Sequence, residues 1–135
     1  MYKYVFPAIL TPCEDGSTGY YVNFPDLEHC FTDGNDLADA VYMASDVLPL
    51  ALTSMEDNGE TIPEPTPIDK VEHTPDQIVT LIYADTIEHR KKFNNKSMNV
   101  TLTLPTWLYT IARHNEINMS QTLKDALKEK LGLME

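Results

Sequence analysis

The chain has 135 residues, 42% of them hydrophobic and 23% charged, which is enough for one domain or two small ones with modest cores. This composition excludes a disordered polyelectrolyte, and no apolar run reaches the roughly 20 residues of a membrane span. Two cysteines without CxxC spacing argue against a disulfide scaffold or structural zinc, and the N-terminus lacks a signal-peptide pattern, so we expect a cytoplasmic protein.

The net charge of −11 changes sign along the chain. Residues 1–88 carry 17 acidic residues and 2 lysines, a net charge of −15, whereas residues 89–135 carry 8 basic and 4 acidic residues, a net charge of +4. We therefore expect two modules, an acidic one that attracts a basic partner and a basic one that lies on phosphate.

The first part of the chain predicts a small sheet. Tyr2 to Leu10 favours a strand, and Pro7 within it implies an edge position or a bulge. Residues 20–24 alternate after a turn-rich stretch and predict a hairpin partner. A short third strand is expected around His29 to Thr32.

A helix is expected next, with Asn35 or Asp36 as its cap and an apolar stripe at helical spacing. Pro49 removes a backbone donor, so it should kink this helix or end its first segment, and Asn58-Gly59 should stop it.

The prolines of residues 63–76 predict an extended connection. The continuous apolar run from Ile78 to Tyr83 predicts a strand that is buried on both faces. Residues 85–96 are polar and basic without a period, and we interpret them as a linker. Residues 1–84 thus predict a β-β-β-α-β domain of the α+β class.

Residues 97–135 predict a β-α-α domain. Its strand alternates strictly over Ser97 to Leu104, and a first helix follows with Thr106 as its N-cap. Residues 115–119 predict a turn that lacks the usual glycine. A second helix is expected between the cap Ser120 and Gly132.

One strand and two short helices cannot bury a core alone, so we expect two copies to pair their strands as a homodimer. The polar face of the resulting ribbon fits the DNA major groove, and the N-terminus of the second helix offers free amides to a phosphate. The predicted DNA-contacting residues are Lys96, Ser97, Asn99, Thr101, Thr103, Ser120 and Gln121.

This pattern resembles the ribbon-helix-helix family of DNA-binding dimers over residues 96–133. The resemblance implies that Asn99, Thr101 and Thr103 read operator DNA and that Ser120 clamps the backbone. The reading face departs from the family in having no Arg or Lys. A strand-helix-helix domain used only for dimerisation stays open as the alternative.

Four ordered motifs of the acidic part resemble the N-terminal domain of HicB antitoxins. They are GYYVNFPDL from Gly19, CFTDG from Cys30, the helix with Leu37, and GETIPEP from Gly59. Glu28-His29 departs from the family's usual Pro-Gly. The resemblance implies a partial RNase H-like fold without its catalytic set, and a small basic HicA toxin that cleaves mRNA as the partner.

The resemblance thus implies an antitoxin that neutralises its HicA toxin and represses its own operon as a dimer, with a higher oligomer left open. From charge and motif, toxin contacts are expected in the hairpin and the loop that follows it. They are Tyr21, Asn23, Asp26, Glu28, His29 and Asp33.

No enzyme activity, catalytic residue, metal site, cofactor or membrane contact is expected. The acidic residues of the first part fall in turns, caps and on a solvated helix face, and His29 beside Cys30 has no further ligand at metal-site spacing. Two alternatives stay open. One is a metal-dependent RNase H-like nuclease with a DNA-binding tail, and the other is a ligand-responsive ribbon-helix-helix repressor without a toxin.

Overall fold

A computed structural model describes residues 2–133 and divides the chain into two compact units. The first unit comprises residues 1–96 and the second comprises residues 97–135. Across the described residues, no helix has the length and apolar character needed to cross a membrane.

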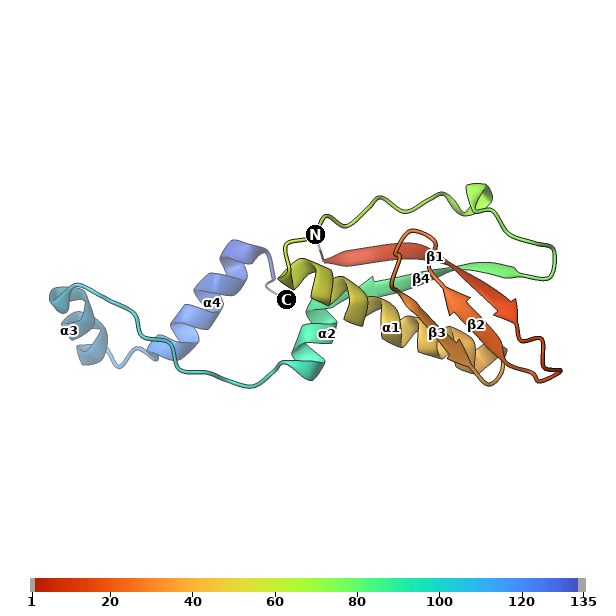
Figure 1. Cartoon of the computed structure of the whole chain (residues 1–135). Coiled ribbons are helices and arrows are strands. Elements are labelled where there is room, and N and C mark those ends of the chain that lie inside the picture. Colours follow the sequence, from red (N-terminus) through yellow and green to blue (C-terminus); the bar gives the residue numbers. More distant parts are fainter. Residues whose placement is uncertain (1, 134–135) are drawn as a thin grey trace. The chain divides into compact units, whose positions relative to one another are not determined.

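The first unit is built on a four-stranded antiparallel sheet with the strand order β3-β2-β1-β4 (Figure 1). Its strands are β1 (Lys3–Pro12), β2 (Tyr20–Asn23), β3 (Phe31–Gly34) and β4 (Ile78–Asp85). The predicted strand order along the chain is confirmed, including the β1–β2 hairpin. The third strand starts two residues later than expected, because residues 27–30 form a turn closed by backbone hydrogen bonds.

Pro7 lies where β1 has a neighbouring strand on one side only. Residues 3–10 of β1 pair with β4, but only residues 9–12 pair with β2. The missing amide hydrogen of Pro7 therefore costs no hydrogen bond on the side facing β2, which agrees with the predicted edge character.

Helix α1 (Leu37–Asp57) covers one face of the sheet (Figure 1). Asp36 caps the helix by accepting a hydrogen bond from the Asp39 amide at 2.8 Å. The helix continues through Pro49 to Asp57, so the expected end of a first segment at Pro49 was wrong, whereas the expected stop at Asn58-Gly59 is confirmed by the cap at Asn58. The core lies between α1 and the sheet, and each large side chain in it contributes about 1.5–3 kcal/mol. It includes Phe6, Leu10, Val22, Phe24, Ala40, Ala44, Leu48, Leu52 and Ile82.

The expectation that β4 is buried on both faces was wrong. Ile82 and Ala84 are 3% and 2% exposed beneath α1, whereas Leu81 and Tyr83 on the opposite face are 51% and 56% exposed. Helix α1 covers one face of β4 and leaves Leu81 and Tyr83 on the other face exposed, so this continuous apolar run contains both core and surface residues. The short helix η1 (Ile68–Lys70) in the long connection contacts β4.

Residues 86–93 form helix α2 (Thr86–Phe93) instead of the expected linker. The Asp85 carboxylate caps it by accepting hydrogen bonds from the amides of Ile87 and Glu88. The helix packs against α1 and has only one buried residue, Thr86. Its sequence shows no apolar period because polar contacts, described below, hold it in place.

The second unit contains α3 (Thr106–His114) and α4 (Met119–Leu131). Both expected caps were wrong by one or two residues. Pro105 precedes α3, and Asn118 caps α4 by accepting a hydrogen bond from the Gln121 amide at 3.0 Å. In the turn between the helices, Glu116 has φ +54° and takes the role of the missing glycine.

Residues 97–105 belong to no helix or strand of the structure. A strand requires a hydrogen-bonded neighbour, and the described part of a single chain offers this segment none. No described residue of the second unit is buried. The predicted ribbon and its pairing stay predictions.

Candidate protein and nucleic-acid interfaces

The second unit presents an open apolar groove of about 680 Å³. Val100, Leu102 and Leu104 line it from the extended segment, and residues of α3 and α4 such as Leu108 and Leu123 complete it. The alternating polar residues of the segment do not line it. The alternation seen in the sequence therefore separates a groove-lining row from a solvent-facing row.

The predicted DNA-contacting residues of the segment are all exposed. They are Lys96, Ser97, Asn99, Thr101 and Thr103. At the start of α4, Ser120 lines the groove, while the Gln121 side chain donates a hydrogen bond to Asp125 at 2.9 Å. The Gln121 amide donates a hydrogen bond to the Asn118 side chain. The amides of Met119 and Ser120 are therefore the ones left for a phosphate at this helix terminus.

The boundary between the units changes the distribution of charge. Residues 1–96 carry 17 acidic and 6 basic residues, a net charge of −11, and residues 97–135 carry 4 of each, a net charge of zero. The excess of cations that the sequence suggested for the tail belongs to α2 and Lys96. Arg90 pairs with Glu56 and Asp57, and Lys91 pairs with Glu88. The prediction of a basic module was therefore wrong.

Three of the predicted toxin contacts share the sheet face that α1 leaves open. Tyr21 on β2 lies opposite Asp33 on β3, and Asn23 follows on the same face because side chains alternate along a strand. Tyr21 is 57% exposed and the neighbouring Phe31 is 66% exposed. The electrostatic interaction with the neighbouring Cys13 side chain, followed by a hydrogen bond to it, raises the pKa of the Tyr21 phenol above its ordinary value.

Asp26, another predicted toxin contact, has an internal role. Its two carboxylate oxygens accept hydrogen bonds from the Thr66 amide at 2.9 Å and the Thr66 hydroxyl at 2.6 Å. These bonds hold the proline-rich connection against the turn after β2. Glu28 and His29 are exposed in that turn, apart from the strand residues.

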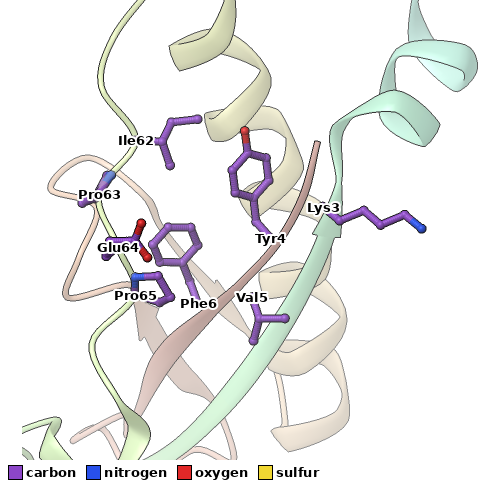
Figure 2. A pocket seen from close by; sticks show the side chains of 8 residues that line it. All are labelled: Lys3, Tyr4, Val5, Phe6, Ile62, Pro63, Glu64 and Pro65. Atoms are coloured by element: carbon purple, nitrogen blue, oxygen red, sulfur yellow. The ribbon is translucent and has the colours of Figure 1, made fainter. Parts of the chain in front are cut away.

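The proline-rich connection runs beside the open side of β1 and leaves a pocket of about 470 Å³ (Figure 2). Lys3, Tyr4, Val5 and Phe6 line one side of the pocket, and residues 62–65 line the other. Pro63 and Pro65 have no amide hydrogen, so this segment cannot pair with β1 as a regular strand. The pocket offers a single carboxylate, that of Glu64, and no set of groups for catalysis.

A polar cluster at the end of α1 was missed by the sequence analysis. The Glu56 carboxylate accepts hydrogen bonds from the Tyr4 hydroxyl at 2.6 Å, the Thr86 hydroxyl at 2.9 Å and the Arg90 guanidinium at 3.0 Å. Arg90 also pairs with Asp57 at 2.9 Å. Burial, followed by the bond to Glu56, raises the pKa of Tyr4 to about 12. The cluster joins β1, α1 and α2 through residues that no local spacing connects.

Metal and thiol chemistry have no assembled site in the described residues. Among them, no three His, Cys, Asp or Glu side chains are grouped so that they could hold a metal ion. Cys13 and Cys30 are both free, and burial raises the pKa of the Cys30 thiol to about 11. Cys30 is therefore a protonated core residue at neutral pH.

Comparisons with known proteins relate the chain to antitoxins of bacterial toxin-antitoxin systems. The chain is 38% identical to Antitoxin HicB 1 of Photorhabdus laumondii over 47% of its length and 39% of that relative. It is 35% identical to Antitoxin HicB of Escherichia coli K12 over 50% of its length and 48% of that relative. These matches thus span less than half of either relative.

A solved chain of a toxin-antitoxin complex from Streptococcus pneumoniae shares the fold, with a TM-score of 0.61 and 24% identity over 95% of this chain and 99% of that one. The family model of the HicB-like antitoxins of bacterial toxin-antitoxin systems matches residues 6–126. The chain belongs to this family, and the resemblance noted in its N-terminal motifs is confirmed.

Proposed function

We propose that the protein is an antitoxin whose first unit binds and neutralises a small basic HicA-type mRNA-interferase toxin and whose second unit represses its own operon as a dimer on DNA. The observation that carries this proposal is the contrast between the units. The first has a closed core and a net charge of −11, and the second has an open apolar groove and no buried residue among those that the structure describes.

The groove supports a second copy of the chain as its occupant. Leu102, Leu104 and Leu127 are 60%, 47% and 51% exposed, which is far more apolar surface than a stable unit of this size leaves to water. A second copy would pair its segment 97–104 with this one, satisfy the open backbone groups and cover both grooves. The fold proposed for residues 97–135 is therefore a ribbon-helix-helix dimer.

Pairing of the two segments would place two copies of Asn99, Thr101 and Thr103 on one exposed ribbon, which fits the major groove. Because the second unit has no net charge, its DNA contacts would depend on base edges, Lys96 and the amides at the start of α4 more than on a broad basic surface. The helices would act as the support that fixes the ribbon.

We expect Asn99→Ala to weaken binding to the operator by about 1–3 kcal/mol, because an Asn side chain can form two hydrogen bonds with adenine. The slope of affinity against salt concentration should not change, since no phosphate contact is removed. Titration of fluorescent operator DNA at several salt concentrations measures both quantities.

Asn95→Ala is the matched control, because Asn95 is exposed but lies before the alternating segment. It should leave operator binding unchanged. If Asn99→Ala lowered toxin affinity as much as operator affinity, the division of functions between the units would be wrong.

Toxin binding is proposed for the first unit because its excess of carboxylates speeds association with a basic partner and competes with RNA for the same basic surface. The open sheet face adds specific contacts through Tyr21, Asn23 and Asp33, with Phe31 beside them. Asp26 is not included, because Thr66 occupies both of its oxygens. An RNase H-like relationship of this unit is proposed from the family resemblance together with the β-β-β-α-β order of its main elements.

A further inference from the structure

A second concave surface of the first unit lies at the β4 edge of the sheet, away from the strands β2 and β3 that carry Tyr21 and Asp33. It is a groove of about 370 Å³ between α1, the end of β4 and α2. We call it the α1–α2 groove. Its walls include Ser45, Asp46 and Pro49 of α1, Tyr83 and Asp85 of β4, and Glu88 and Phe93 of α2.

The groove is rich in hydrogen-bond acceptors. Asp46 is exposed and makes no hydrogen bond or ion pair with the residues described. Asp85 uses only one carboxylate oxygen, Oδ1, for capping α2. Glu88 pairs with Lys91 at 3.3 Å, but both side chains are more than half exposed, so this pair is weak.

Pro49 adds a further acceptor. In a helix the amide of residue 49 would donate to the carbonyl of Ser45, and proline has no amide hydrogen. The Ser45 hydroxyl does not replace it, since that group donates to the Val41 carbonyl at 3.0 Å. The proline that fails to end α1 therefore leaves a backbone carbonyl without its usual donor in the wall of the groove.

Aromatic rings flank these acceptors. Tyr83 is 56% exposed and Phe93 is 64% exposed. Lys92 and His89 also line the groove, and the Lys92 ammonium lies 5.3 Å and the His89 ring centre 4.7 Å from the centre of the Phe93 ring, so this ring already attracts a cation of this chain. The groove therefore combines carboxylates, a backbone carbonyl that lacks its usual amide donor, and partly exposed aromatic rings.

We propose that the α1–α2 groove binds an arginine side chain of the basic protein partner. A guanidinium offers five donors, stacks on aromatic faces and loses less hydration energy than an ammonium, which matches all three features of the groove. The net charge of −11 on this unit favours the same partner. The identity of the partner rests on the proposed function, whereas the chemistry of the groove is independent of it.

The groove itself is tested on the full chain with N-acetyl-arginine methylamide as the probe, followed by NMR. We expect saturable shifts confined to the groove, at Ser45, Asp46, Tyr83 and Phe93. The neutral citrulline analogue should produce none, and the double variant Asp46→Asn, Glu88→Gln should lose them. Absence of saturable shifts, or the same shifts in the double variant, would overturn the proposal.

The partner is tested by the affinity of a purified HicA-type toxin for full-length variants. The groove double variant should bind about tenfold more weakly or worse, because a charged contact is removed. Glu60→Gln with Glu72→Gln is the matched control, since it removes the same charge from exposed positions elsewhere and should change the affinity less than about threefold.

Equal affinities of the two double variants would contradict the groove as a toxin contact and leave the proposed function standing. If the arginine probe bound and the wild-type chain did not bind the toxin, the partner assigned here and the proposed function would both be wrong. The two failures are therefore distinguishable.

Discussion

Leu102→Glu is expected to abolish both dimerisation and operator binding. Leu102 lines the apolar groove of the second unit and is 60% exposed in the single chain, and in the proposed dimer a second copy covers it and gives the unit a core. A carboxylate buried there without a partner costs several kcal/mol, on the order of the whole stability of a small domain. Light scattering measures the loss of the dimer, and titration of operator DNA measures the loss of binding.

The neighbouring residue gives the matched control. Thr101→Glu adds the same charge, but on the polar row that does not line the groove. It should leave the dimer intact and weaken operator binding through repulsion from the phosphates. A Leu102→Glu protein that stays dimeric, or a Thr101→Glu protein that becomes monomeric, would contradict the proposed arrangement.

Gly34→Ala is expected to lower the free energy of unfolding of the first unit by about 3 kcal/mol or more, as overpacking against rigid backbone does. Gly34 ends β3 where the sheet meets the start of α1. A Cβ atom built there lies 2.3 Å from the Ala40 nitrogen and 2.4 Å from its Cα, so strand and helix must separate. Chemical denaturation followed by circular dichroism measures the change, while fluorescence of Trp107 reports on the second unit.

Gly16→Ala is the control for the general effect of replacing glycine. Gly16 has φ +80°, but a Cβ there meets no atom within 4 Å. Its replacement should cost only about 1–2 kcal/mol of backbone strain. A loss of stability at Gly34 no larger than at Gly16 would show that the contact between β3 and α1 is not tight.

Local patterns predicted those elements whose apolar residues repeat regularly. The α1 stripe of Ala40, Ala44 and Leu48 identified that helix and its buried face. The alternation from Ser97 to Leu104 separated the groove-lining row from the exposed polar row. Pro7 indicated the one-sided pairing of β1, because a missing amide is tolerated only at an edge.

The errors arose where long-range contacts decide the outcome. Helix α2 has no apolar period. Hydrogen bonds to Glu56 attach it to α1, and Glu56 is 30 residues from Thr86 and 34 residues from Arg90 in the sequence. The tertiary packing of α1 against the sheet overcame the helix-breaking tendency of Pro49. Apolar composition could not show that β4 has only one covered face, because that depends on where the helices pack.

The same limit applies to the candidate sites. Splitting the charge at residue 88 assigned the cations of α2 to the DNA-binding tail, and only the fold reveals that they belong to the first unit. Asp26 matched a motif, yet Thr66, 40 residues later, binds its carboxylate. The α1–α2 groove combines three elements that are distant in sequence, so no local pattern predicts it.

The first unit is proposed to bind a basic toxin independently of the second unit. The most direct test of this proposal is the affinity of a purified HicA-type toxin for the full chain and for its Leu102→Glu variant, measured by calorimetry at increasing salt. Both proteins should bind the toxin with equal affinity, and this affinity should fall as salt screens the charges. A wild-type chain that does not bind, or a Leu102→Glu variant that loses the toxin together with the operator, would contradict the proposal.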